Sequence, residues 1–378
     1  MKPPIYLDNA SSSFPKPKSV AKAVADAINL VGANPGRSSH ALGLKASRIV
    51  FETREAAALL LGLNSPERII FTKNATEGIN LALKGLLGPG DKVAISCLEH
   101  NAVIRPLTVF KKRGVKIVRA PCDANGLPDP GAVPDVKMLV TVSASNVTAA
   151  LADIKRLGKA CKKKNVLLMV DASQTAGCVP FDTSNIDVLA CSGHKGLLGP
   201  QGTGFVWFAP HVEPRTMIEG GSGSDSQSAL MPVYWPDRHE AGTLNTPGLA
   251  GLKAAIKYLS RRTIEAVRQS EVALCRIILD RLRDDRRIVV YPPRGAAAWK
   301  RRAGLVSFNA KGVDPAELGD RLDRLGVAVR VGLHCAPEAH RFLGTFPDGT
   351  VRVSPGAMTR KADIKKFFKA LDKALTMR

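Results

Sequence analysis

The chain has 378 residues, of which 45% are hydrophobic and 23% are charged. This composition excludes overall disorder, and the length is enough for one large domain and a smaller one. The seven cysteines include no Cys-x-x-Cys pair, so we expect neither a disulfide scaffold nor a thiolate metal site. The N-terminal residues lack the apolar stretch of a secretory signal, and no run reaches the roughly 18 apolar residues of a membrane span. We therefore expect a cytoplasmic protein without a membrane segment.

The formal net charge of +22 favours anionic partners such as nucleic acid, phosphorylated cofactors or acidic protein surfaces. The basic residues are scattered along the chain, and aromatic residues make up only 5% of it. A surface that stacks bases needs aromatic side chains among the basic ones. The composition therefore argues against nucleic acid as a partner and favours a generally basic enzyme.

The first two thirds of the chain alternate between helical and β-rich segments. Helical spacing dominates from Ser19 to about Leu61, interrupted by a loop from Gly32 to Ser39. This alternation predicts a mostly parallel sheet covered by helices, with functional groups in the loops after the strands. The predicted strands are 68–72, 92–96, 115–119, 137–141 and 166–170, with helices beginning near Thr76, Ala102 and Leu151.

The pattern changes at Thr246-Pro247, where a long helical stretch begins and runs to about Arg286. We predict a large α/β domain over 16–246. Residues 247–378, together with the N-terminal segment 1–15, form a small α+β domain. Its predicted strands are 288–291, 305–309 and 327–331, and its predicted helices are 315–325 and 361–375.

Small, polar or titratable residues follow several of the predicted strands. Asn74-Ala75-Thr76 opens a helix, which suits either a bound phosphate or an ordinary N-cap. His100, after the second strand, is by itself more often structural than functional. Asp171 ends a buried strand, where a carboxylate is costly unless it meets a cation.

A lysine stands in the turn that follows the next apolar run. Ser192-Gly193-His194-Lys195 ends that run, and Lys195 faces either solvent or the buried Asp171. A lysine opposite an aspartate can serve as a Schiff-base amine on an aldehyde cofactor. Pyridoxal 5′-phosphate (PLP) needs this lysine, an aspartate at its pyridinium nitrogen and a phosphate site.

At this point the sequence resembles a known family. Asp171-Ala-Ser-Gln174 followed by Ser192-Gly-His194-Lys195 is similar to the motifs of class V aminotransferase-fold enzymes, and among them to cysteine desulfurases and selenocysteine lyases. The resemblance runs from Tyr6 to Arg352. It implies the α/β architecture called PLP-dependent transferase fold type I, in which a mostly parallel seven-stranded sheet lies between helices.

The resemblance assigns a role to each residue around the cofactor. Lys195 would bind the PLP aldehyde covalently and carry the substrate α-proton. Asp171 would pair with the pyridine nitrogen, Gln174 would bind the ring oxygen, and His100 would stack on the ring and assist proton transfer. The remaining implied cofactor-binding residues are Ala75, Thr76, Asn146, Ser192, His194 and, from the other subunit of a homodimer, Thr243.

The resemblance also implies the residues that hold an amino-acid substrate. Arg352 and Asn146 would bind its carboxylate, and Arg330 is a further substrate-binding residue. Arg37 and His40 would line the entrance.

The residue that decides the reaction is Cys335, in Arg330-Val-Gly-Leu-His-Cys-Ala-Pro337. In the resembled family a cysteine here takes the substrate sulfur as a persulfide and alanine is released. Arg330 and His334 could favour the reactive thiolate. A buried, inert cysteine is the alternative. The short segment from Cys335 to Arg352 resembles the family type that passes sulfur to an acceptor protein or acts on selenocysteine.

Three positions depart from the resembled pattern and are expected to border the substrate pocket. Ser143 stands where histidine is frequent, Ala149 stands where glycine is usual, and the loop 220–226 is unusually polar. We therefore keep three hypotheses. The first is a PLP-dependent cysteine desulfurase, with selenocysteine lyase as its close variant. The second is an aminotransferase or β-lyase of the same fold, and the third is a non-catalytic basic protein that binds a partner such as tRNA.

Overall fold

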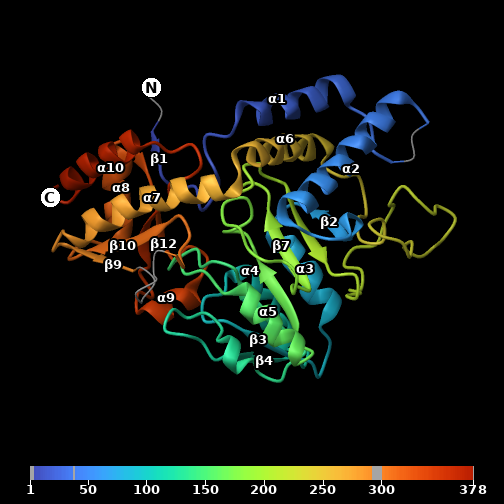
Figure 1. Cartoon of the computed structure of the whole chain (residues 1–378), viewed down its shortest axis with the longest axis horizontal. Helices are drawn as coiled ribbons and strands as arrows, with labels where there is room; N and C mark the ends of the chain where they lie inside the picture. The colour runs from blue at the N-terminus through green and yellow to red at the C-terminus, as the bar shows by residue number, and fades with distance from the viewer. Residues whose placement is uncertain (1–3, 37–38, 292–299, 378) are drawn as a thin grey trace.

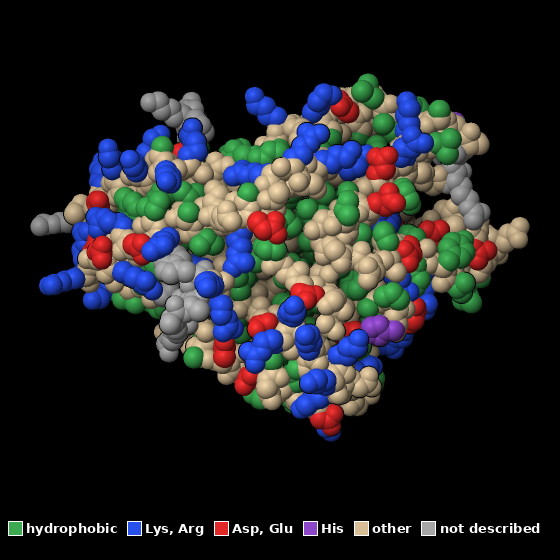
Figure 2. Space-filling model, in the orientation of Figure 1, with side chains coloured by type: hydrophobic (Ala, Val, Ile, Leu, Met, Phe, Trp, Pro, Cys, Tyr) green, Lys and Arg blue, Asp and Glu red, His purple; other side chains and the backbone are tan. Residues whose placement is uncertain are grey.

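The computed structural model describes residues 4–36, 39–291 and 300–377. Figure 1 shows a large unit built on a central sheet and a smaller unit beside it, with the chain's N-terminus next to the small unit. Within the described residues no helix combines the length and apolar character needed to cross a bilayer. Lys and Arg side chains are spread widely over the face shown in Figure 2 and do not gather in a single stripe.

The large unit contains a seven-stranded sheet with strand order β2-β8-β7-β6-β5-β3-β4. Strand β8 runs antiparallel to both of its neighbours, and the other paired strands run parallel. The mostly parallel seven-stranded sheet implied by the sequence is thus confirmed, and each of the five predicted strands is present within one residue. The strands are β2 (Ile69–Thr72), β3 (Lys92–Ile95), β4 (Lys116–Arg119), β5 (Met138–Val142), β6 (Leu167–Asp171), β7 (Val188–Ser192) and β8 (Gly204–Phe208).

Helices on both sides bury the apolar strands of this sheet, which is why β5, β7 and β8 are buried along their whole length. Polar side chains fix where several helices begin. Asn74, His100 and Asp153 each accept a hydrogen bond from the first turn of the helix that follows. The helices of this unit are α1 (Lys18–Asp26), α2 (Ala41–Leu61), α3 (Ala75–Leu86), α4 (Asn101–Lys111), α5 (Ile154–Lys163) and α6 (Thr246–Arg262), with short helical turns at Ala27–Val31, Pro66–Arg68 and Pro130–Ala132.

The small unit has a four-stranded antiparallel sheet of order β12-β13-β10-β9 and a parallel pair, β1-β11. The predicted strand 327–331 is in fact two strands that enter different sheets. Strands β1 and β13 and helix α9 were not predicted. The elements are β1 (Ile5–Tyr6), α7 (Ile264–Arg283), β9 (Ile288–Val290), β10 (Val306–Ala310), α8 (Pro315–Arg324), β11 (Val327–Ala328), β12 (Arg330–Gly332), α9 (Pro337–Leu343), β13 (Thr350–Val353) and α10 (Lys361–Ala374).

Helix α6 packs on α1 and α2, and its apolar residues belong to the core of the large unit. Helix α7, one residue further on, contributes most of its buried face to the core of the small unit. By packing, we therefore place the change between units at Thr263, one helix later than the predicted boundary at 247. By packing, the N-terminal segment goes with the small unit, because Leu7 is buried in its core and β1 pairs with β11.

The turn that carries Lys195 is packed directly against a glycine of the preceding loop. Gly177 has a φ of +85°, and a Cβ there would lie 2.7 Å from the carbonyl carbon of Gly196 and 2.9 Å from the amide of Leu197. Only glycine avoids both the left-handed strain and the overlap at this position. The lysine turn therefore depends on this close approach.

We expect Gly177→Ala to lower the free energy of unfolding by about 3 kcal/mol, because strain and overlap add. Gly90→Ala is the matched control, since Gly90 has a φ of +87° but open space around its Cβ position. That control should lose only about 1 kcal/mol. Urea unfolding of both variants measures the difference, and equal losses would show that the contact with Gly196 is unimportant.

Candidate active site

A cavity of about 230 Å³ opens at the carboxyl ends of β5, β6 and β7, where the amino ends of α3 and α4 meet them. This is the edge at which parallel sheets of this kind collect ligands. Most of the residues singled out in the sequence come together here. The lining residues are Asn74, Ala75, Thr76, His100, Ala102, Val142, Ala144, Asn146, Asp171, Ser173, Gln174, Ser192, His194 and Lys195.

Lys195 and Asp171 reach this cavity from neighbouring strands. Asp171 is the last residue of β6 and accepts a hydrogen bond from the Ser173 amide at 2.9 Å. Burial lowers the pKa of Lys195, with the nearby arginines adding to the effect and Asp171 opposing it. A lysine amine whose pKa is lowered holds its proton less tightly, so it is better prepared to attack an aldehyde.

His100 is fixed in its neutral form. Its Nδ1 accepts a hydrogen bond from the Ala102 amide at 3.0 Å, which leaves the proton of the neutral ring on Nε2. Burial lowers the pKa of His100 to about 4. The ring is therefore uncharged and carries one N–H, at Nε2.

Another part of the cavity lining offers donors to an anion. Ala75 and Thr76 begin α3, and the Asn74 side chain accepts a hydrogen bond from the Glu77 amide at 3.0 Å. The first backbone N–H groups of a helix bind phosphates. His194 has a buried Nδ1 without a hydrogen-bond partner among the described residues, and burial lowers its pKa to about 4.

Arg352 is buried at the centre of a polar cluster that includes Asn146 of the cavity lining. Its guanidinium donates to the Asn146 carbonyl at 3.0 Å, to Asp8 Oδ1 at 3.0 Å and to Ser11 Oγ at 2.8 Å. Ser11 Oγ also accepts from Arg330 at 3.1 Å and donates to Asp8 Oδ1 at 2.7 Å. The Ser11 hydroxyl therefore contacts both arginines. Arg352 and Asn146, the residues expected to bind the substrate carboxylate, are in contact with each other.

Cys335 is exposed, and its peptide segment is held from both sides. The Asn101 amide donates to the Cys335 carbonyl at 2.8 Å, and the Asn146 side chain donates to the His334 carbonyl at 2.7 Å. His334 and Cys335 have φ values of +50° and +57°, a left-handed conformation that costs energy in residues other than glycine. The contacts that hold this conformation fix the cysteine next to the start of α4.

The expectation that His334 charges the neighbourhood of Cys335 is wrong. Burial lowers the pKa of His334 to about 2, and Nε2 contacts Thr350 Oγ1 at 3.0 Å. The imidazole is therefore neutral and structural. Arg330 lies half-buried in this region, where its guanidinium donates to Ser11 Oγ.

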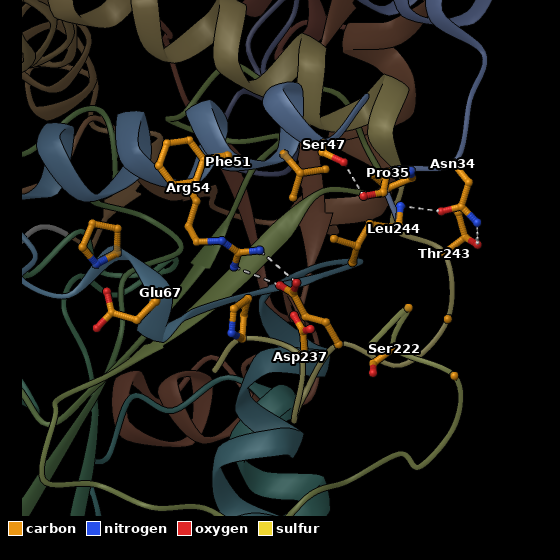
Figure 3. Close-up of a pocket in the computed structure, with 18 of the residues that line it drawn as sticks. Asn34, Pro35, Ser47, Phe51, Arg54, Glu67, Ser222, Asp237, Thr243 and Leu244 are labelled. Atoms are coloured by element: carbon orange, nitrogen blue, oxygen red, sulfur yellow. Dashed lines mark hydrogen bonds and ion pairs between the residues drawn. The ribbon is translucent and has the colours of Figure 1, made fainter. Parts of the chain in front are cut away.

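Thr243 and His40 do not line the 230 Å³ cavity. Thr243 instead lines a second, larger pocket of about 880 Å³, where its hydroxyl accepts a hydrogen bond from Asn34 at 3.4 Å (Figure 3). His40 caps α2, because its Nδ1 accepts a hydrogen bond from the Gly43 amide at 3.2 Å. Arg37 lies outside the described residues.

The three departures from the family pattern do not border the 230 Å³ cavity among the described residues. Ser143 points to Thr175, with 2.6 Å between the hydroxyl oxygens. Ala149 is buried with a φ of +65°, which explains why glycine is usual there. The polar loop 220–226 contributes residues to the larger pocket.

Three residues near the site were missed in the sequence. Asp8 and Ser11 lie over 300 residues from the arginines that they hold, and no local pattern reveals such a contact. Glu99 precedes His100, and its completely buried carboxyl group accepts the Val142 amide at 3.1 Å. An acidic residue in the short loop after an apolar strand was the available signal for Glu99.

Comparison with known proteins places the chain in a family. The model of the family described as aminotransferase class-V matches residues 5–367. The chain belongs to this family. The resemblance seen in the sequence is therefore confirmed, and the protein is an enzyme of a family whose members use PLP.

Similar members of the class-V family carry related names. A protein of Methanothermobacter thermautotrophicus named a probable cysteine desulfurase is 34% identical, over 93% of this chain and 89% of its own length. Cysteine desulfurase CsdA of Escherichia coli is 30% identical, over 99% of this chain and 94% of its own. The apo structure of a cysteine desulfurase from Thermococcus onnurineus NA1 has a TM-score of 0.88 at 30% identity, covering 98% and 94% of the two chains.

Burial holds the Glu99 carboxyl group in its neutral form and raises its pKa to about 8. Its Oε1 accepts hydrogen bonds from the Ser96 hydroxyl and the Val142 amide, whereas Oε2 has no hydrogen-bond partner among the described residues. A carboxyl group with a raised pKa stabilises the fold fully below its ordinary pKa of 4.5, and that contribution is lost as the pH rises to about 8.

We expect Glu99→Gln, which keeps the shape and stays neutral, to gain stability relative to the unmodified protein as the pH rises from 4.5 to about 8. The gain should be roughly 1.4 kcal/mol for each pH unit at its steepest. Urea unfolding across this range measures it. The exposed Glu265→Gln is the control and should show no such trend. A pH-independent difference for Glu99→Gln would contradict a neutral carboxyl group.

Proposed function

We propose that this protein is a PLP-dependent cysteine desulfurase. It would convert L-cysteine to L-alanine and carry the removed sulfur as a persulfide on Cys335. The observation that carries the proposal is the placement of an exposed cysteine on a fixed segment beside His100, next to a cavity that holds Lys195 and Asp171. An aminotransferase would need the lysine and the aspartate but has no use for such a thiol.

The residues that line the cavity fit PLP. Lys195 supplies the amine for its aldehyde, and Asp171 supplies a carboxylate for the pyridinium nitrogen. Ala75, Thr76, Ser192 and His194 would hold its phosphate, where the unpartnered Nδ1 of His194 offers a further contact. Bound there, PLP acts as an electron sink for the bonds around the substrate α-carbon. Gln174, fixed by its hydrogen bond to the Ala10 carbonyl at 2.9 Å, would contact the ring from the side.

The substrate carboxylate would bind at Arg352 and Asn146. The Nε of Arg352 has no hydrogen-bond partner among the described residues, so this donor is available to a carboxylate. Asn146 Nδ2 carries a second N–H besides the one that it donates to the His334 carbonyl. Asp8 and Ser11 hold the guanidinium in place before substrate arrives. Preorganised binding of this kind lowers the entropy lost when the substrate is oriented.

Two groups can move protons at the substrate. The Lys195 amine, whose pKa is lowered by burial, would take the α-proton. His100 would offer its Nε2–H on the other side, since Nδ1 is occupied by the Ala102 amide.

Cys335 would then attack the substrate sulfur as a thiolate. The new S–S bond forms on Cys335 Sγ as the bond between the substrate sulfur and Cβ breaks, and its electrons pass to the substrate carbon, which is later protonated to give alanine. Because Cys335 is exposed, an acceptor protein can reach the persulfide. All seven cysteines are free, which supports a reducing compartment such as the cytoplasm.

We expect Cys335→Ala to lose alanine formation from L-cysteine by at least roughly 100-fold, because the sulfur has no acceptor. Alanine release is measured, with L-selenocysteine as a second substrate and Cys275→Ala as a control in the core of the small unit. Retained cysteine activity in Cys335→Ala would refute the desulfurase. Activity on L-selenocysteine alone, in the unmodified protein, would favour the selenocysteine lyase.

We further propose a homodimer in which the 880 Å³ pocket faces the partner. Its Thr243 lies apart from the PLP cavity of its own chain, so it would serve the site of the other subunit. Figure 3 shows Phe51 and Thr243 at opposite walls of this pocket. Large apolar side chains are exposed on the surrounding α2 and the 218–234 segment, namely Leu42, Leu44, Phe51, Leu59, Ile218, Leu230, Val233 and Tyr234.

We expect sedimentation to give twice the chain mass of 40.3 kDa, and Phe51→Glu to shift the protein to the monomer. A charge buried in an apolar interface is strongly unfavourable. Ile277→Glu is the matched control, because Ile277 is also exposed but lies on α7. A monomeric unmodified protein that binds PLP fully would overturn the proposal, as would dissociation by Ile277→Glu but not by Phe51→Glu.

A further inference from the structure

Two cysteines outside the proposed mechanism lie in contact. The Sγ atoms of Cys97 and Cys122 are 3.5 Å apart, and both side chains are half-buried. The other cysteines apart from Cys335 are buried. Cys97 and Cys122 therefore combine proximity to a second thiol with access to solvent.

The backbone brings these two cysteines together. Strands β3 and β4 pair in parallel with Ile95 opposite Arg119, and the Ala120 amide donates to the Ile95 carbonyl at 3.0 Å. The Arg119 guanidinium then spans the gap to the Ser96 carbonyl at 2.9 Å. Each cysteine follows the end of its strand by two or three residues, so their contact is a result of the sheet register.

We propose that Cys97 and Cys122 form a reversible disulfide by exchange with a small-molecule disulfide such as glutathione disulfide. Rotation of the side chains has to shorten the Sγ–Sγ distance to about 2 Å, the length of a disulfide bond. The structure thus assigns a redox modification site to the loops after β3 and β4.

The exchange balances in two steps. The Cys97 thiolate attacks the small-molecule disulfide, forming a mixed disulfide and releasing one small thiolate. The Cys122 sulfur then attacks Cys97 Sγ, its proton passes to solvent, and the second small thiol leaves. The protein loses two electrons and two protons, and the reagent is reduced to two thiols. Burial raises the pKa of Cys122 to about 12, which agrees with its acting second.

The site adjoins two parts of the active site. Cys97 is three residues before His100 on the same loop. Arg119, between the two cysteines, also forms an ion pair with Glu338 of α9, the helix that follows Cys335. A disulfide between Cys97 and Cys122 would link the loop that carries His100 to the loop after β4. Arg119, near the start of that second loop, contacts the helix that follows Cys335.

Peptide mapping tests the proposal on the folded, full-length protein. Trypsin leaves each cysteine alone in its peptide, Cys97 in 93–111, because the Arg105–Pro106 bond resists cleavage, and Cys122 in 120–137. The protein is treated with glutathione disulfide, free thiols are blocked, and the digest is analysed by mass spectrometry. We expect a linked pair of these two peptides that separates on reduction.

Variants of single cysteines complete the test. Cys122→Ala should stop at a glutathione mixed disulfide on Cys97, whereas the buried Cys161→Ala should form the linked pair as the unmodified protein does. Circular dichroism establishes that each variant is folded. The proposal is overturned if the folded protein gives only mixed disulfides at both positions, links Cys97 to Cys335 instead, or leaves both thiols free.

Discussion

The buried guanidinium of Arg352 is the group on which the geometry of the site depends. A charge that is 2% exposed must be surrounded by partners, and no single segment supplies them. Asp8 and Ser11 come from the N-terminal segment, and the Asn146 carbonyl comes from the loop after β5. Satisfying this one cation therefore brings three distant parts of the chain to the same place, and one of its partners, Asn146, also lines the cavity.

Burial, more than ion pairing, sets the protonation states around the cavity. It lowers the pKa of Lys195, His100, His194 and His334, and it raises the pKa of Glu99. In each case the uncharged form is favoured. The chain as a whole carries a net charge of +22, yet several titratable groups around its reactive centre are held close to neutrality. The lowered pKa of Lys195 leaves more of its amine in the uncharged form, which is the form that can take up a proton.

The sequence predicts best those features that repeat locally. The alternation of apolar strands and helices predicts the bounds of five strands of the large sheet to within one residue. Asp171, Ser192 and Lys195 stand at or after strand ends in the sequence, and they line one cavity in the structure. The boundary between units is less accurate, because α6 and α7 have the same helical pattern and differ only in which core they bury. That difference depends on tertiary packing.

Contacts between distant segments account for most of the remaining differences. Strand β1 has two residues, too few for a pattern, and exists because it pairs with β11. The charged role expected for His334 fails because burial, which a motif does not reveal, keeps the ring neutral. Under the proposed dimer, Thr243 would act on the site of the second chain, and a single sequence contains no local signal of which surfaces meet.

The fixed peptide around Cys335 has a consequence for sulfur delivery. Hydrogen bonds from Asn101 and Asn146 hold this segment in a strained left-handed conformation, so the thiol has little freedom to travel. Under the proposed function, the motion needed for transfer has to come from the acceptor, which must bring its own thiol on an extended or mobile segment. It is then the acceptor that loses conformational entropy when the transfer complex forms. The flexibility of the acceptor therefore governs the rate at which sulfur is transferred from Cys335.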